Sequence, residues 1–187
     1  MDFLAYLLFF IILIIFGINV WLIWSFFIGL LKKNKAAPYV GTFDKEIRLM
    51  RENLHLIKWK KLVDLGCGDG KALRFFVKHF GIKWTWYDIN VFAILLGRIV
   101  NYFLGFGKNI KLIKSDFMKI DLSMFDYVYV YLLPVQLAFI EDWLWENIDK
   151  NSIIISNSFQ FKNHTPFDII KDKKGKWCIF LYKKEKN

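Results

Sequence analysis

The chain has 187 residues, of which 56% are hydrophobic and 19% aromatic, and it carries a formal net charge of +10. This length allows one domain of ordinary size with an appendage, and it excludes two complete enzymatic domains. The positive charge could suit nucleic acid or an anionic membrane surface, but no long block of like charges favours nucleic acid. Cys67 and Cys178 have no spacing to each other or to a histidine that is typical of a metal site, so no metal is expected.

The N-terminal segment contains no charged side chain from residue 3 to residue 31. About 20 apolar residues are enough for a helix to cross a bilayer. A cleaved signal peptide would have a shorter apolar run preceded by positive charge. The one charged side chain before this run is that of Asp2, which is negative. Lys32, Lys33 and Lys35 follow the run, and the positive-inside rule places that end in the cytoplasm. Residues 1–35 are therefore predicted to be a single-pass membrane anchor with a basic flank, followed by a cytoplasmic domain.

Residues 36–187 are predicted to form that second domain, an α/β structure. The expected strands are 61–65, 84–87, 110–113, 127–131 and 152–156. The expected helices are 44–57 (with Ile47, Met50, Leu54 and Ile57 on one face), 71–79, 91–103 and 135–146. An antiparallel pair at 167–170 and 177–182 is expected to close the sheet. This alternation is typical of a mostly parallel sheet with helices on both faces.

A glycine-rich turn follows the first expected strand and opens a helix, where open α/β sheets bind ligands. Its glycines are Gly66, Gly68 and Gly70. A dinucleotide fingerprint would need a third small residue where Lys71 stands. A P-loop fails as well, because no glycine lies at the required upstream position and Ala72 replaces Ser or Thr.

Carboxylates bracket this turn and would repel a pyrophosphate, since Asp64 precedes it and Asp69 lies within it. They suit S-adenosylmethionine, which carries two cationic groups and no phosphate. Asp88 ends the second expected strand, where it can bind the ribose hydroxyls, and Asp116 with Phe117 follows the third, where both can meet the adenine. Each aspartate alone could be a helix cap or a turn former. Together, after successive strands, they favour the cofactor.

The chain from Pro38 onward resembles class I methyltransferases. More narrowly, it is similar to the membrane-associated protein lysine methyltransferases that act on the adenine nucleotide translocase and the ATP synthase c-subunit, and to their prokaryotic relatives. The matching segments are Pro38-Tyr39-Val40-Gly41-Thr42, Asp64 to Lys71, Tyr87-Asp88-Ile89-Asn90, Ser115-Asp116-Phe117 and Tyr131-Leu132-Leu133-Pro134. The family more often has Glu at Asp88 and Ser at Cys67.

The resemblance implies a Rossmann-like, seven-stranded and mostly parallel sheet with an antiparallel C-terminal hairpin, S-adenosyl-L-methionine at the strand ends, and a lysine amine as methyl acceptor. The residues expected to contact the cofactor are Tyr39, Thr42, Asp64, Gly66, Cys67, Gly68, Asp69, Gly70, Asp88, Ile89, Asn90, Asp116 and Phe117.

A channel for the acceptor is expected beside the fourth strand, lined by Tyr131, Leu132, Leu133 and Pro134, with Tyr131 and Pro134 nearest the chemistry. Tyr39 and Thr42 would close over the cofactor. Enzymes that methylate nucleobase amino groups place Asn, Asp or Ser before two prolines and an aromatic residue there, so a nucleic-acid partner is not expected. Tyr131 could equally be a packed aromatic residue at a strand end. His55, His79 and His164 are taken as surface or core residues.

Three functions remain open at this point. The first is a membrane-anchored protein-lysine N-methyltransferase whose partners are the bilayer and a protein with an accessible lysine. The second is a lipid or quinone methyltransferase, which the same anchor would suit. The third is a non-catalytic membrane module that keeps the cofactor site.

Overall fold

The computed structural model describes residues 3–31, 41–66, 70–88, 91–106 and 110–184. The chain divides into two compact units, Met1–Tyr39 and Val40–Asn187.

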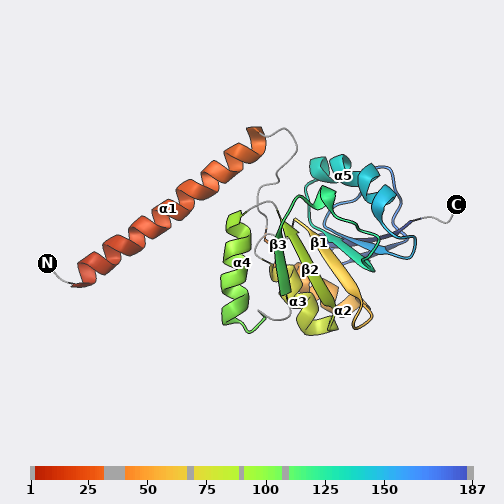
Figure 1. The fold of residues 1–187 in the computed structure, drawn as a ribbon, viewed down its shortest axis with the longest axis horizontal. Coiled ribbons are helices and arrows are strands. Elements are labelled where there is room, and N and C mark those ends of the chain that lie inside the picture. Colours follow the sequence, from red (N-terminus) through yellow and green to blue (C-terminus); the bar gives the residue numbers. More distant parts are fainter. Residues whose placement is uncertain (1–2, 32–40, 67–69, 89–90, 107–109, 185–187) are drawn as a thin grey trace. The chain divides into compact units, whose positions relative to one another are not determined.

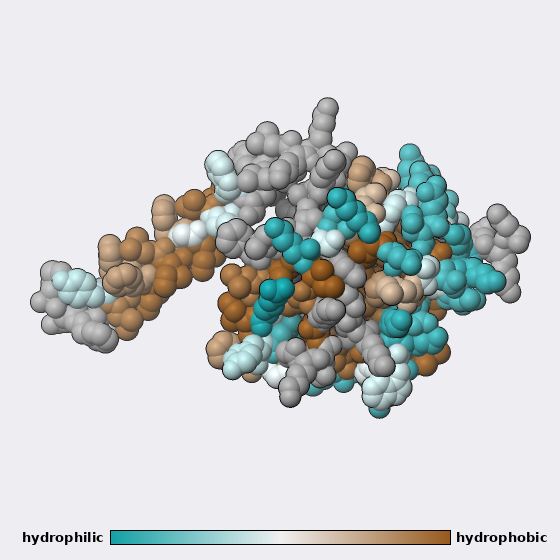
Figure 2. Space-filling view, viewed as in Figure 1, coloured by the Kyte–Doolittle hydropathy of each residue, from teal (hydrophilic) through white to brown (hydrophobic). Residues whose placement is uncertain are grey.

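The described part of the first unit is one helix, α1 (Phe3–Leu31). Its segment Tyr6–Trp24 has a mean hydropathy of 2.7 and none of it is buried. Figure 2 shows hydrophobic residues along most of its described length. The Asn19 amide donates to the Ile15 carbonyl at 2.8 Å, so this polar side chain is satisfied within the helix itself. By length and composition, α1 is able to cross a membrane.

The second unit is built on one mixed sheet with the strand order β3-β2-β1-β4-β5-β7-β6. Strands β1 to β5 run parallel, and β7 is antiparallel to both β5 and β6. The strands are β1 (Lys61–Leu65), β2 (Lys83–Asp88), β3 (Ile110–Lys114), β4 (Tyr127–Val130), β5 (Ile153–Asn157), β6 (Asp168–Lys171) and β7 (Cys178–Lys183). The helices are α2 (Asp44–Asn53), α3 (Lys71–Phe80), α4 (Val91–Phe103) and α5 (Pro134–Asn147), with a short 3-10 turn η1 (Phe117–Lys119). Figure 1 shows this arrangement.

The strand order reverses beside β1, since the chain moves from β1 outward to β2 and β3 and then returns to place β4 on the other side of β1. Such a switch point leaves a crevice at the carboxyl ends of the strands, where ligands of open α/β sheets bind. The carboxyl ends of β1, β4 and β5 therefore form one continuous edge, which we call the carboxyl edge.

The core beneath this edge is aromatic as well as aliphatic. The Phe76 ring of α3 meets the Tyr129 ring of β4 edge-on, with centroids 5.2 Å apart. Both side chains are almost completely buried. Helix α3 thus packs on the face of the sheet at β4, the strand that carries Tyr129.

Helix α2 ends at Asn53 and not near Ile57 as its apolar spacing predicted. Leu54 is already extended, and the Ile57 amide donates to the Tyr127 hydroxyl at 3.1 Å. Ile57 itself is exposed. A tertiary hydrogen bond therefore holds a residue that the helical periodicity had assigned to the buried face.

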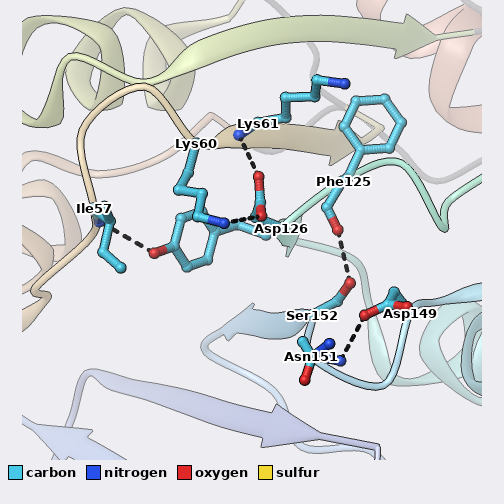
Figure 3. Close-up of polar contacts among 9 residues, drawn as sticks. Ile57, Lys60, Lys61, Phe125, Asp126, Asp149, Asn151 and Ser152 are labelled. Atoms are coloured by element: carbon cyan, nitrogen blue, oxygen red, sulfur yellow. Dashed lines mark hydrogen bonds and ion pairs between the residues drawn. The ribbon is translucent and has the colours of Figure 1, made fainter.

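The amino ends of β1, β4 and β5 are held by polar contacts at the opposite edge of the sheet, shown in Figure 3. Asp126 accepts a hydrogen bond from the Lys60 ammonium at 2.7 Å and one from the Lys61 amide at 2.8 Å. The Ser152 hydroxyl donates to the Phe125 carbonyl at 2.7 Å. These contacts fix the strands at the edge that is remote from the crevice.

Candidate functional site

The carboxyl edge gathers polar side chains from three neighbouring strands. Asp64 of β1 lies opposite Tyr129 of β4, and Val130 of β4 lies opposite Ser156 of β5. Parallel pairing therefore brings the residues that follow each strand to the same end of the sheet. This end is where the sequence predicted a ligand.

The glycine turn after β1 requires glycine at both of its described positions. Gly66 has φ +86°, and a Cβ added there would lie 3.1 Å from the Leu132 Cδ2 atom. Gly70 has φ +80° at the N-cap of α3. Side chains rarely adopt such angles, so glycine is the residue that suits both positions. Cys67, Gly68 and Asp69, also expected here, lie outside the described residues.

Asp64 is buried at the penultimate position of β1, with 2% of its surface exposed. The pKa of Tyr129 on the neighbouring strand is raised well above its usual value. Burial is the largest cause, and the negative charge of Asp64 is the second. The Asn157 amide donates to the Tyr129 hydroxyl at 3.1 Å, and Thr42 hydrogen-bonds to the same phenol. Thr42, predicted to close over the cofactor, is thus a buried partner of β4.

Glu46 is a second buried carboxylate at this edge, in the first turn of α2. Its Oε2 accepts a hydrogen bond from the Phe43 amide at 2.8 Å, and its Oε1 accepts one from the Ser158 hydroxyl at 2.8 Å. Sequence reasoning missed Glu46 because it treated the segment only as an amphipathic helix. An acid on the buried side of that helix, beside Met50, was the available signal.

Tyr131 follows β4 and is partly exposed. Burial raises its pKa to about 12, with further contributions from the charge of Glu46 and a hydrogen bond to it. The phenol therefore stays protonated at any physiological pH. The predicted acceptor-side tyrosine lies beside an acid that the sequence had not singled out.

Ser158 follows β5 in the left-handed region, with φ +67°. A non-glycine residue held there costs about 1–3 kcal/mol, and such strain concentrates at functional sites. Its hydroxyl contacts Glu46 and its amide donates to the Cys178 carbonyl at 2.9 Å. Ser158, Asn157 and Tyr129 were not predicted as site residues, since only the three-dimensional pairing of β4 and β5 brings them together.

The remaining expected residues lie around the same edge or outside the described part. Asp88 ends β2 and pairs with Lys114 of β3, as its backbone shows. Asp116 caps η1 by accepting from the Met118 amide at 3.0 Å, and the Phe117 ring lies 6.0 Å from that of Trp143. Pro134 is the first residue of α5, where its missing amide costs nothing. Tyr39, Ile89 and Asn90 lie outside the described residues.

The described histidines have structural surroundings that match the sequence interpretation. His164 stacks on Trp145 with ring centroids 3.6 Å apart, and its Nδ1 atom is 2.9 Å from the Glu141 carboxylate. Glu141 also accepts hydrogen bonds from the Lys162 and Asn163 amides. Glu141, a third buried acid, therefore anchors a loop.

These residues fit S-adenosylmethionine as a ligand. The first glycine of the turn, Gly66, lies two residues after the buried Asp64, and β2, the next strand, also ends in a carboxylate. Acidic groups at these places favour a cationic nucleoside and disfavour a phosphate.

Comparison with known proteins agrees with the geometry. The family model of the ANTKMT methyltransferase domain matches residues 64–168. A protein-lysine N-methyltransferase of Saccharolobus islandicus is 26% identical over 152 residues, covering 78% of this chain and 92% of that protein. A human lysine N-methyltransferase named for the ATP synthase c-subunit is 25% identical over 129 residues, which covers 69% of this chain and 54% of that enzyme.

Among solved structures, an RNA methyltransferase from Salinibacter ruber bound to S-adenosyl-L-homocysteine has a TM-score of 0.71 at 20% identity, covering 79% of this chain and 95% of that one. At this identity the likeness concerns the fold, which is that of class I methyltransferases. Family match, fold and site agree, and the chain belongs to the ANTKMT methyltransferase domain family of S-adenosylmethionine-dependent methyltransferases.

Proposed function

We propose that this enzyme is a protein-lysine N-methyltransferase, held in a membrane by α1 with its α/β domain on the cytoplasmic side. The observation that carries the acceptor class is the agreement of two relatives from distant organisms, both named as lysine N-methyltransferases. The anchor rests on the length and hydropathy of α1. The orientation rests on the lysines that follow it.

The proposed cofactor contacts follow from the carboxyl edge. When bound, S-adenosylmethionine supplies a methyl group on a positively charged sulfur. Asp64 and the backbone of the glycine turn would hold its charged end, Asp88 its ribose, and Asp116 with Phe117 its adenine. The partners Thr42 and Asn157 keep Tyr129 fixed next to Asp64, so the acid is presented by a rigid strand.

The acceptor would enter past the segment from Tyr131 to Pro134. Leu132 is buried against Gly66, which places an apolar wall next to the glycine turn. An apolar wall removes water from an incoming lysine and so favours the neutral amine that can be methylated. The same wall offers no side-chain amide or carboxylate for a nucleobase amino group.

The proposal is tested by methyl labelling in host membranes. Membranes from cells lacking this gene would be incubated with the purified full chain in detergent and with S-adenosylmethionine labelled in its methyl group. We expect label in protein, and mass spectrometry should find it on a lysine side chain. Label that extracts into organic solvent would instead identify a lipid or quinone acceptor.

A further inference from the structure

The site contains a buried acid that the cofactor contacts do not use. Glu46 has 1% of its surface exposed and accepts hydrogen bonds from Phe43 and Ser158. A buried carboxylate costs several kcal/mol unless it is paired. An ionised carboxylate offers about four acceptor positions, so the bonds from Phe43 and Ser158 and the hydrogen bond to Tyr131 leave capacity for one further donor.

The surroundings of Glu46 are those of a functional group. Its partner Ser158 is held at φ +67°, a strained angle that turns the hydroxyl toward the acid. Glu46 is tied by this bond to the end of β5, next to the end of β4 and therefore to the carboxyl edge. Tyr131, which hydrogen-bonds to Glu46, is partly exposed.

We infer that Glu46 is the group that receives the acceptor amine, binding its ammonium and taking up the proton that it must lose before methylation. This inference rests on the proposed lysine specificity. It assigns to Tyr131 the position of a hydrogen-bonding neighbour and to Ser158 that of a positioning residue, which acts by orienting the Glu46 carboxylate.

The proposed step balances in atoms and charge. The lysine ammonium gives one proton to the Glu46 carboxylate, which leaves a neutral amine and a neutral carboxylic acid. The nitrogen lone pair then forms a bond to the methyl carbon, and the carbon–sulfur bond breaks with its electron pair left on sulfur. The positive charge passes from sulfur to the methylated nitrogen.

Tyr131 and Asp64 are other acidic groups at this edge, and neither suits that task. Burial, the charge of Glu46 and the hydrogen bond to it hold the pKa of Tyr131 at about 12, so its phenol cannot accept a proton near neutral pH. Asp64 lies within β1 opposite Tyr129, two residues before Gly66. Glu46 is the carboxylate adjoining the predicted acceptor segment.

The test uses sinefungin, a cofactor analogue that carries an ammonium group where the cofactor carries its transferable methyl. Affinities of sinefungin and adenosylhomocysteine for the full chain in detergent would be measured by calorimetry. In Glu46→Gln we expect the dissociation constant of sinefungin to rise about tenfold, and that of adenosylhomocysteine to stay within about twofold, since the lost charge faces only the added ammonium. An unchanged ratio of the two affinities overturns the inference.

Glu141→Gln is the matched control. Glu141 is also 1% exposed and also accepts backbone hydrogen bonds, but its contacts lie in the 162–164 loop. This variant should lose stability as Glu46→Gln does and leave the ratio of affinities unchanged. A shift of that ratio in both variants would mean that burial of any carboxylate is responsible, and would sink the assignment to Glu46.

A second readout is the pH dependence of methyl label transfer to membranes from cells lacking the gene. The Glu46→Gln variant lacks an internal proton acceptor, so it can methylate only lysine side chains that are already neutral in solution. Its rate should therefore rise steeply as the pH approaches the lysine pKa of about 10.4. The parent chain should level off at lower pH. Parallel pH profiles would contradict the proton-transfer part of the inference.

Ser158→Gly provides the test if Glu46→Gln does not fold, because glycine accepts φ +67° without strain. It removes the hydroxyl that orients Glu46, so it should weaken the binding of sinefungin a few-fold more than the binding of adenosylhomocysteine. An unchanged ratio here also counts against the inference. Failure of the parent chain to bind adenosylhomocysteine at all would refute the proposed function itself, which keeps the two failures distinct.

Discussion

Glu46 and Ser158 are 112 residues apart in the sequence, yet the Ser158 hydroxyl donates to the Glu46 carboxylate at 2.8 Å. The bond ties the first turn of α2 to the end of β5, and Tyr131 at the end of β4 contacts both residues. A helix that precedes the sheet in the sequence is thereby fixed at its carboxyl edge. The predicted cofactor contacts and the inferred amine site consequently lie at the same edge of the sheet.

Gly66 should not tolerate a side chain. Alanine at Gly66 must adopt φ +86° and place its Cβ 3.1 Å from Leu132. We expect a loss of about 1–2 kcal/mol from the left-handed backbone, a further loss from the contact, and weakened binding of adenosylhomocysteine. Thermal unfolding and calorimetry measure the two effects.

Gly175→Ala is the control for that substitution. It has a similar angle, φ +65°, but nothing lies within 4 Å of an added Cβ. It should show the backbone cost alone and bind adenosylhomocysteine normally. Equal behaviour of the two variants would show that the approach to Leu132 has no role at the site.

Asp64→Asn should weaken cofactor binding more than it weakens the fold. The substitution keeps the shape but removes the buried charge that we expect to face the cationic end of the ligand. Hydrogen bonds to charged groups contribute about 1.5–3 kcal/mol, so affinity for adenosylhomocysteine should fall by about tenfold to a hundredfold. Calorimetry with Asp126→Asn, at the opposite edge of the sheet, gives the comparison. Parent-like affinity in Asp64→Asn would remove this residue from the cofactor site.

The sequence predicted the regular elements well because their signals are local. Strand β1 and helix α4 were predicted with the bounds that the structure has, from a short apolar run and from a helical apolar pattern. The end of α2 was wrong because a contact to Tyr127, 70 residues away, competes with its periodicity.

The same difference between local patterns and tertiary contacts applies to the candidate site. The glycine turn and the aspartates at strand ends are local patterns and were predicted, whereas Tyr129 and Asn157 became a pair only when β4 met β5, 28 residues later. Glu46 shows the limit most clearly. Its inferred role depends on its contacts with Ser158 and Tyr131, and no spacing within α2 indicates either partner.

Asp126 should make the fold pH-dependent in acid. Burial raises its pKa, but hydrogen bonds from Lys60 and Lys61 outweigh this effect and lower the pKa below the usual value of 3.8. A carboxyl group whose pKa is lowered in the folded state stabilises the fold above its unfolded pKa, and this contribution is lost as the pH falls through the folded value.

At neutral pH the free energy of unfolding of the parent chain should therefore be higher than that of Asp126→Asn by about 0.5–1 kcal/mol, the range of a partly screened ion pair. Chemical unfolding between about pH 6 and pH 2 should show the two free energies of unfolding converging below about pH 4. A constant difference across that range would mean that Asp126 stabilises the strands by shape and not by charge.

Helix α1 should lose its hold on membranes when charge is placed at its centre. Ile14 and Ile15 lie near the middle of the apolar segment Tyr6–Trp24. Replacing both by arginine costs about 2.5–3.5 kcal/mol each for insertion at the helix centre, whereas replacing both by leucine costs nearly nothing. Extraction of membranes with alkaline carbonate should release the arginine variant and retain the leucine variant. Because α1 forms a unit separate from Val40–Asn187, both variants should bind adenosylhomocysteine alike in detergent. A parent chain released by carbonate as readily as the arginine variant would disprove the anchor, while leaving the assignment of the enzyme intact.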